Sequence, residues 1–139
     1  MTVNARYTHE AQRLDASGYL GLASNAHDSL NELRADVSYY WRGMIGVTLA
    51  PFDTWGSQDA LLYGGNRTLR PDSDGVILQL DGTPWGAGSP LGSAFNLRVG
   101  IQYTAYFRFN GANQNWDGLG IGHNASDNNT LRIFTWIAY

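Results

Sequence analysis

Strict alternation between apolar and polar side chains from residue 94 to 110 constrains the fold more than any other feature of this chain. The odd positions from Phe95 to Phe109 are all apolar or aromatic, and among the even positions Tyr106 is the one large exception. A period of two residues is typical of a β-strand with one apolar and one polar face. Strands of soluble proteins average about 5–6 residues, whereas a strand that crosses a membrane needs about 9–11. This segment is long enough for a strand that crosses a membrane.

Five further segments repeat the alternation, as where Val37, Tyr39 and Trp41 oppose Asp36 and Ser38. A composition without Lys, with two Glu, 17 Gly and 18 aromatic residues, is poor in helix formers. We therefore expect one all-β unit over residues 1–139, an antiparallel up-and-down meander of about six long strands. The strands are expected near residues 3–12, 33–42, 44–52, 76–83, 94–110 and 130–139.

The connections between the expected strands alternate in length. Long polar segments occupy residues 15–31, 53–73 and 111–129, whereas Arg42-Gly43 forms a hairpin-sized turn and about ten residues join the fourth strand to the fifth. Outer-membrane barrels have short turns at the periplasmic end and long loops at the other end. The order of long and short connections in this chain follows that rule, and a soluble sandwich has no reason to follow it.

The polar faces of the expected strands carry charges of both signs. In a membrane barrel the apolar face contacts lipid and the polar face lines the lumen. A solvated outer face with weak surface ion pairs is the alternative interpretation. On the barrel interpretation, the expected lumen-lining residues are Arg6, Glu10, Arg34, Asp36, Asp81, Arg98, Arg108 and Arg132.

Aromatic residues gather at the ends of the expected strands. Amphipathic rings concentrate at both edges of the apolar band of a barrel, whereas ordinary core aromatics of a sandwich need no such placement. The expected interface aromatics are Tyr39, Trp41, Trp85, Phe107 and Phe109.

Several classes of function are excluded or disfavoured by composition. The absence of Cys excludes disulfides, Cys-bound metals and covalently attached haem, and a net charge of −3 argues against a nucleic-acid partner. The three histidines have no metal-ligand spacing, and no nucleophile-elbow, P-loop or zinc-protease motif is present. No apolar run is long enough for a membrane helix, and no secretory signal is visible. We expect no enzyme activity, no cofactor and no metal.

The stretch NLRVGIQYTAYFRFNGANQNWDGLGIGHNASDNNTLRIFTWIAY resembles the C-terminal end of a proteobacterial porin-like outer-membrane β-barrel family. TLAPFDTWGSQDALLYG and GVILQLDGTPWG resemble preceding strands and loops of the same family. Some members carry cytochrome c labels, which implies a c-type cytochrome as a partner in extracytoplasmic electron transfer, although this chain cannot bind such a haem.

The resemblance implies an exported protein of a Gram-negative bacterium, located in the outer membrane as part of a full-length parent and in contact with the lipid bilayer. The last strand resembles the signal that the barrel-assembly machinery reads, which consists of Leu131, Ile133, Ile137 and the terminal Tyr139.

Six strands are too few for a membrane barrel, since the smallest common ones have eight. We therefore expect this chain to be a C-terminal fragment of a larger barrel, completed by N-terminal strands or by other copies. It would act as a passive pore or as a scaffold around a partner. The alternative is a soluble β-sandwich or jelly-roll module that binds a carbohydrate through Trp55, Trp116 and the Asn- and Asp-rich loops.

Overall fold

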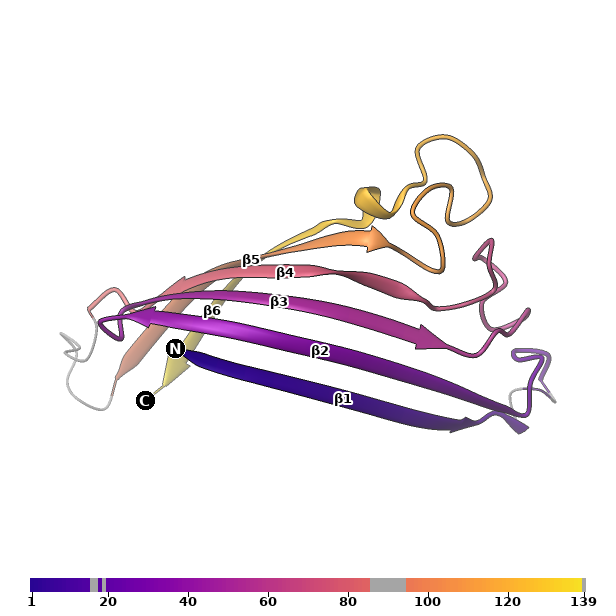
Figure 1. Cartoon of the computed structure of the whole chain (residues 1–139), viewed down its shortest axis with the longest axis horizontal. Coiled ribbons are helices and arrows are strands. Elements are labelled where there is room, and N and C mark those ends of the chain that lie inside the picture. The colour runs from indigo at the N-terminus through magenta and orange to yellow at the C-terminus, as the bar shows by residue number, and fades with distance from the viewer. Residues whose placement is uncertain (16–17, 19, 86–94, 139) are drawn as a thin grey trace.

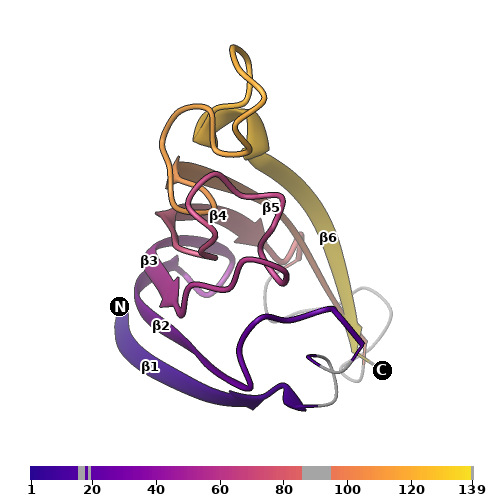
Figure 2. The same cartoon turned by 90° about the vertical axis from the view of Figure 1, so that its right-hand side faces the viewer.

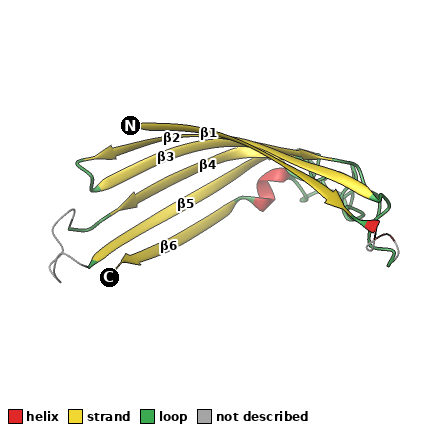
Figure 3. Ribbon diagram, turned by 90° about the horizontal axis from the view of Figure 1, so that it is seen from below, coloured by secondary structure: helices red, strands yellow, loops and turns green. Residues whose placement is uncertain are grey.

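Six strands form one antiparallel sheet in the order in which they occur in the chain. The structure is a computed structural model that describes residues 1–15, 18, 20–85 and 95–138. The expected all-β antiparallel meander is confirmed. A short 3-10 helix, η1 (Ala125–Asn128), precedes the last strand (Figure 3). The strands are β1 (Thr2–Arg13), β2 (His27–Trp41), β3 (Ile45–Gly56), β4 (Ser73–Gly82), β5 (Asn96–Arg108) and β6 (Thr130–Ala138).

The sheet is curved but not closed. Seen along the strands, β1 to β6 follow an arc (Figure 2), and β1 and β6 each pair with one neighbour only. Both edge strands are long, with 12 residues in β1 and 9 in β6. Each edge therefore presents a row of backbone groups without a strand partner.

The two ends of the sheet differ in their connections (Figure 1). The described residues among 14–26, together with 57–72 and 109–129, lie at one end, which we call the loop end. The opposite turn end holds the β2–β3 turn, the end of β4, the start of β5, the start of β1 and the end of β6. In the β2–β3 turn, Arg42 and Gly43 have φ values of 52° and 68°. Positive φ at both central residues is typical of the hairpin turn that the sequence predicts at this position.

The expected strand bounds are correct to within a few residues, except at β2. This strand begins at His27, six residues before the expected start, because Asp28 and Ser29 continue to pair with β1. Pairing between β2 and β3 is interrupted opposite Pro51 and resumes at Val37–Leu49. Proline has no N–H to donate, so an interruption is expected at this position. The expected strand residues 94 and 139 lie outside the described residues.

The two faces of the sheet have opposite chemistry. One face, which we call the outer face, exposes large apolar side chains such as Leu33, Leu49, Leu78 and Ile133. The other, which we call the inner face, carries polar and charged side chains around a hollow. Cross-strand pairing keeps the phase, since Val37, Leu49, Leu78, Tyr103 and Leu131 occupy one continuous row.

This sheet has no apolar core of its own. Within the described part of the chain, the buried apolar residues are four alanines, at positions 23, 50, 112 and 125. The accessible surface of 8891 Å² exceeds by about a quarter the roughly 7,100 Å² expected for a folded monomer of 15.3 kDa. The outer face is thus an apolar surface on which no other part of the described residues is packed as a core.

A bulge interrupts the alternation near the loop end of β5. Gly75 pairs with Tyr106 and Asp74 pairs with Arg108, so Phe107 is an extra residue on β5. A Cβ at position 75 would lie 2.1 Å from the carbonyl oxygen of Ala105. Only glycine permits this close approach, and the bulge shifts the residues that follow to the opposite face.

The carboxylate of Asp59 holds two long loops together. It is 1% exposed and accepts hydrogen bonds from the backbone N–H groups of Ser24, Asn25, Leu61 and Leu62 at 2.7–2.9 Å. Burial alone would raise the pKa of Asp59, but the four N–H donors outweigh it and hold the pKa well below its ordinary value. The loop 57–72 also contacts the third long loop, because the Arg67 N–H donates to the carbonyl oxygen of Trp116 at 2.7 Å.

We predict that acid loosens this loop pair. A carboxyl group whose folded pKa is depressed contributes stability above its unfolded pKa, and that contribution declines as pH falls below the unfolded value of about 3.8. Amide hydrogen exchange at Leu61 and Leu62, corrected for the intrinsic rate, should be several-fold less protected at pH 3 than at pH 6. In Asp59→Asn the protection should be low at both pH values. Equal protection of the unsubstituted chain at the two pH values would contradict the prediction.

Candidate pore-lining surface

The inner face of the sheet forms a polar trough near the turn end. Side chains from β2 to β6 enclose a hollow of about 700 Å³, open on one side because the sheet is not closed. Its charged residues are Arg34, Asp36, Asp81, Arg98 and Arg132. Gln79, Gln102, Ser38 and Thr48 supply uncharged polar groups between them. The trough is therefore polar and carries charges of both signs.

Small and large residues alternate across the trough in one cross-strand row. Tyr40, Gly46, Asp81, Gly100 and Phe134 pair in that order from β2 to β6. A Cβ at Gly46 would overlap the Tyr40 ring, and one at Gly100 would lie 2.3 Å from Cζ of Phe134. The two rings thus lie over the two glycines, with Asp81 between them. This arrangement covers the glycine backbone and leaves the Asp81 side chain 1% exposed.

Asp81 is a buried carboxylate whose partners are all on the inner face. Arg98 donates through Nε to Oδ2 at 2.7 Å, and Gln79 donates to Oδ1 at 2.8 Å. Arg98 also donates to the hydroxyl of Tyr40, and its guanidinium carbon lies 5.3 Å from the centroid of that ring. A buried charge is tolerated when it is paired and its remaining acceptors are satisfied. The cluster joins β2, β4 and β5.

A second set of polar contacts covers the inner face of β1 and β2. Asn4 donates to Asp36 at 2.9 Å, and Arg6 pairs with Glu32 at 2.8 Å. Arg6 and Glu10 line a smaller hollow of about 290 Å³ toward the loop end. Of the eight expected lumen-lining residues, seven lie on the inner face, with Arg108 as the exception. That this face encloses a lumen stays a prediction.

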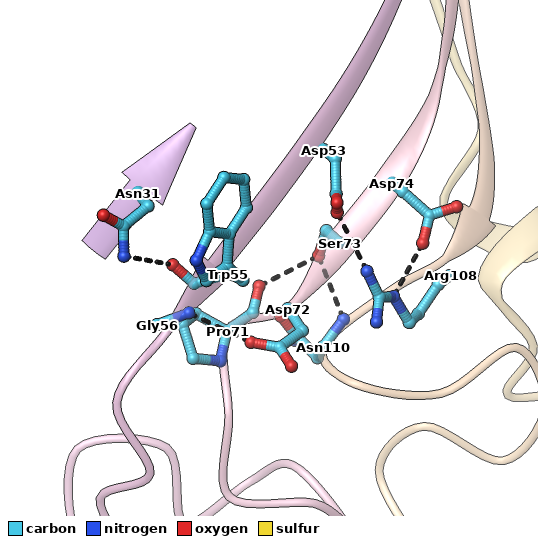
Figure 4. Close-up of polar contacts among 10 residues, drawn as sticks. All are labelled: Asn31, Asp53, Trp55, Gly56, Pro71, Asp72, Ser73, Asp74, Arg108 and Asn110. Carbon is cyan, nitrogen blue, oxygen red and sulfur yellow. Dashed lines mark hydrogen bonds and ion pairs between the residues drawn. The ribbon is translucent and has the colours of Figure 1, made fainter. Parts of the chain in front are cut away.

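Arg108 lies on the outer face, against the expectation from simple alternation. Its Nη2 is 2.9 Å from Asp53 and its Nε is 2.6 Å from Asp74 (Figure 4). Asp53 and Asp74 are in phase with the apolar outer residues Leu49 and Leu78. The bulge at Phe107 shifts Arg108 by one position, so an even-numbered residue of β5 reaches the odd-numbered face.

The expected interface aromatics occupy different environments. Tyr39 and Trp41 are exposed on the outer face at the turn end, where the Arg42 guanidinium carbon lies 4.7 Å from the Trp41 ring centroid. Phe107 is exposed at the bulge. Phe109 instead packs edge-on against Tyr106 and Trp116, with ring centroids 5.1 Å apart in both pairs.

Trp85 and the expected assembly signal complete the set of expected residues. Trp85 packs against Phe95 with ring centroids 6.2 Å apart. In the expected assembly signal, Leu131, Ile133 and Ile137 are exposed on the outer face of the edge strand β6. Tyr139 lies outside the described residues.

Sequence reasoning missed the aromatic part of the trough. Phe134 and Trp136 occupy even positions on the polar side of the last strand, and both line the trough with Tyr40. The signal that could have found Phe134 is the pairing of an aromatic residue with glycine on the next strand, as in Tyr40–Gly46 and Phe134–Gly100, whereas Trp136 pairs with Arg98 and carries no such signal. That signal requires the register, which the sequence does not state directly.

Other candidate sites gain no geometric support. No group of three or more potential metal ligands exists among the described residues, and no described helix is long and apolar enough to cross a membrane. Trp55 stacks on Tyr7, whereas Trp116 packs against Phe109. The two tryptophans proposed for carbohydrate binding therefore have different neighbours in the fold.

Comparisons with protein-family models, with curated proteins and with solved structures find no match for this chain. The resemblance to a porin-like family therefore stays a prediction from the quoted segments.

We predict that Asp81 and Arg98 are energetically coupled. Asp81→Ala leaves a partly buried guanidinium without its carboxylate. The loss of stability in the double variant with Arg98→Met should therefore be smaller than the sum of the losses in the two single variants. In urea unfolding of the chain refolded in detergent micelles, the coupling energy should be about 2 kcal/mol.

The control is the pair of Arg6 and Glu32, whose side chains are 65% and 35% exposed. The same cycle with Gln at both positions should give a coupling below about 0.5 kcal/mol, as for exposed ion pairs. A coupling for Asp81 and Arg98 no larger than that of the control would show that the buried pair does not anchor the trough.

Proposed function

We propose that this chain is part of an outer-membrane β-barrel whose inner face lines a water-filled pore for small solutes. The single observation that carries the proposal is the charge-free apolar belt on the outer face. Between the turn end and the row that contains Leu33, every outer-face residue of β2 to β6 in the described chain is uncharged, and nearly all are apolar.

The height of the belt supports a membrane-spanning role. On β2 it extends from Ala35 to Trp41, and on β5 over nine residues from Leu97 to Ala105. Nine residues are separated by eight steps of about 3.4 Å and span roughly 27 Å along the strand. A strand tilted by about 40° then crosses about 20 Å, close to the apolar band of roughly 25 Å that outer-membrane barrels present to lipid.

Polar groups mark both limits of the belt. At the loop end, Asp53, Asp74 and Arg108 form an ion-paired cluster on the outer face (Figure 4). At the turn end, Trp41 lies under the guanidinium of Arg42. Ionic groups and amphipathic rings are favoured at the level of the lipid headgroups.

The unpaired edges require further strands. In hydrocarbon, each unsatisfied backbone group costs several kcal/mol, so an open sheet does not persist there. In this proposal β1 and β6 pair with strands of a preceding segment or with another copy, and the barrel-assembly machinery inserts the completed barrel. A bound c-type cytochrome remains a prediction of the resemblance alone.

A soluble sandwich would need a second sheet or other partner over the outer face. No second sheet is present in the described residues. A chain that stays monomeric and folded without detergent would favour the soluble alternative over the pore.

We predict opposite accessibility for neighbouring residues of one strand. The chain contains no Cys, so single cysteines for spin labels can be introduced without background. In lipid vesicles, labels at Leu78 and Ile101 should collide preferentially with dissolved oxygen, which concentrates in hydrocarbon. Labels at Gln79 and Gln102 should collide preferentially with a water-soluble nickel chelate, because they lie in the polar trough.

The adjacent positions of each pair serve as matched controls, since they share strand, depth and label. Equal collision rates at Leu78 and Gln79, and again at Ile101 and Gln102, would overturn the assignment of a lipid-facing and a water-facing side.

A further inference from the structure

The carboxylates of the trough are committed to partners, whereas two of its guanidinium groups are not. Asp81 is held by Arg98 and Gln79, and Asp36 accepts from Asn4. Within the described part of the chain, Arg34 and Arg132 have no carboxylate within ion-pair distance. The surplus charge that the trough presents to water is therefore positive, which favours an anionic solute.

Two aromatic residues of the trough are packed on the sheet, whereas a third is exposed. Tyr40 and Phe134 cover Gly46 and Gly100, so their rings contribute to the packing of the inner face. Trp136 is 55% exposed although it lines the trough. An exposed indole on a polar surface offers a face on which a flat ring can stack.

The free guanidinium and the exposed indole lie on the same strand. Arg132 and Trp136 are four residues apart on the inner face of β6, about 13 Å along the strand at 3.3 Å per residue. Phe134 lies between them on the same face, and the Arg132 guanidinium carbon is 5.9 Å from the centroid of its ring. Arg132 and Trp136 both line the hollow of about 700 Å³, whose volume is sufficient for one six-membered ring that carries one acid group.

We propose that this part of the trough binds small aromatic carboxylates, with the carboxylate on Arg132 and the ring against Trp136. Arg98 pairs directly across the sheet with Trp136, but its guanidinium is already held by Asp81. The inference rests on the proposed function, because it assumes that the trough faces water inside a barrel. It narrows the passing solute from any small polar molecule to ring-bearing anions.

The test uses the full chain in detergent micelles, with empty micelles as the blank and circular dichroism to confirm the β-sheet. Binding is followed by saturation-transfer NMR of four probes. Benzoate has both features, benzamide keeps the ring without the charge, cyclohexanecarboxylate keeps the charge without the aromatic ring, and methyl glucoside is a neutral sugar. Benzoate should bind most tightly. Benzamide should bind roughly tenfold more weakly, because a charge-assisted hydrogen bond is lost.

Two variants locate the site, and a third is the control. Arg132→Gln should weaken benzoate binding roughly tenfold, and Trp136→Leu should weaken it several-fold without changing the preference for benzoate over benzamide. Arg42→Gln removes a guanidinium on the outer side of the turn and should leave binding unchanged. If Arg132→Gln does not fold, Arg132→Lys should bind measurably more weakly than the unsubstituted chain, because its ammonium lacks the planar fork.

Equal binding of benzoate and benzamide, tighter binding of methyl glucoside, or an undiminished affinity in the Arg132 variant would overturn the proposal. Conductance in planar bilayers separates this result from the pore itself. Ion conduction without benzoate binding would support the pore and contradict the binding site. Benzoate binding to a chain that never conducts would support the binding site and contradict the pore.

Discussion

The phase of side-chain alternation across five strand pairs is the constraint on which the rest of this structure depends. A slip of one residue in any pair would move that strand's charges to the outer face and its apolar residues into the trough. The register holds the phase from β1 to β6, so that Val3, Val37, Leu49, Leu78, Tyr103 and Leu131 share one row. The separation into two chemically distinct faces follows from that register and needs no packed core.

Hydrophobic burial cannot set this register within the chain, because the outer face is uncovered. The inner-face contacts provide the specificity instead. Tyr40 and Phe134 each fit over a glycine on the neighbouring strand, and Asp81 lies between them within reach of Arg98. A shifted strand would place a ring against a side chain or leave the buried carboxylate without its cation, and both changes are costly. The contacts on the polar face therefore determine the strand register, whereas the apolar face does not discriminate between registers.

The sequence was sufficient for the number of strands, their order and the face of most charged residues, because a period of two over long segments is a strong local signal. It failed at Arg108, since the bulge depends on a close approach of Gly75 to the backbone of the neighbouring strand, which is a contact between distant segments. It also failed at the start of β2, where Asp28 and Ser29 carry no alternation and pair only because β1 continues beside them. Trp136 was missed because the sequence alone does not explain two aromatic residues on the polar side of the last strand. Their role is visible only when the neighbouring residues on β5 are known.

The arrangement of charges links the fold to the proposed solute preference. Because the Asp81 carboxylate is buried between two rings, it needs a cation beside it, and Arg98 supplies one from the adjacent strand. Since that carboxylate is buried and paired, it contributes little to the electrostatic potential in the hollow. The remaining charges of the trough are Arg34, Arg132 and Asp36, whose partner Asn4 is neutral, so their sum is positive. The formal charges of the trough are thus nearly balanced. Because Asp81 is paired with Arg98, the charges that remain accessible to a solute are mainly positive.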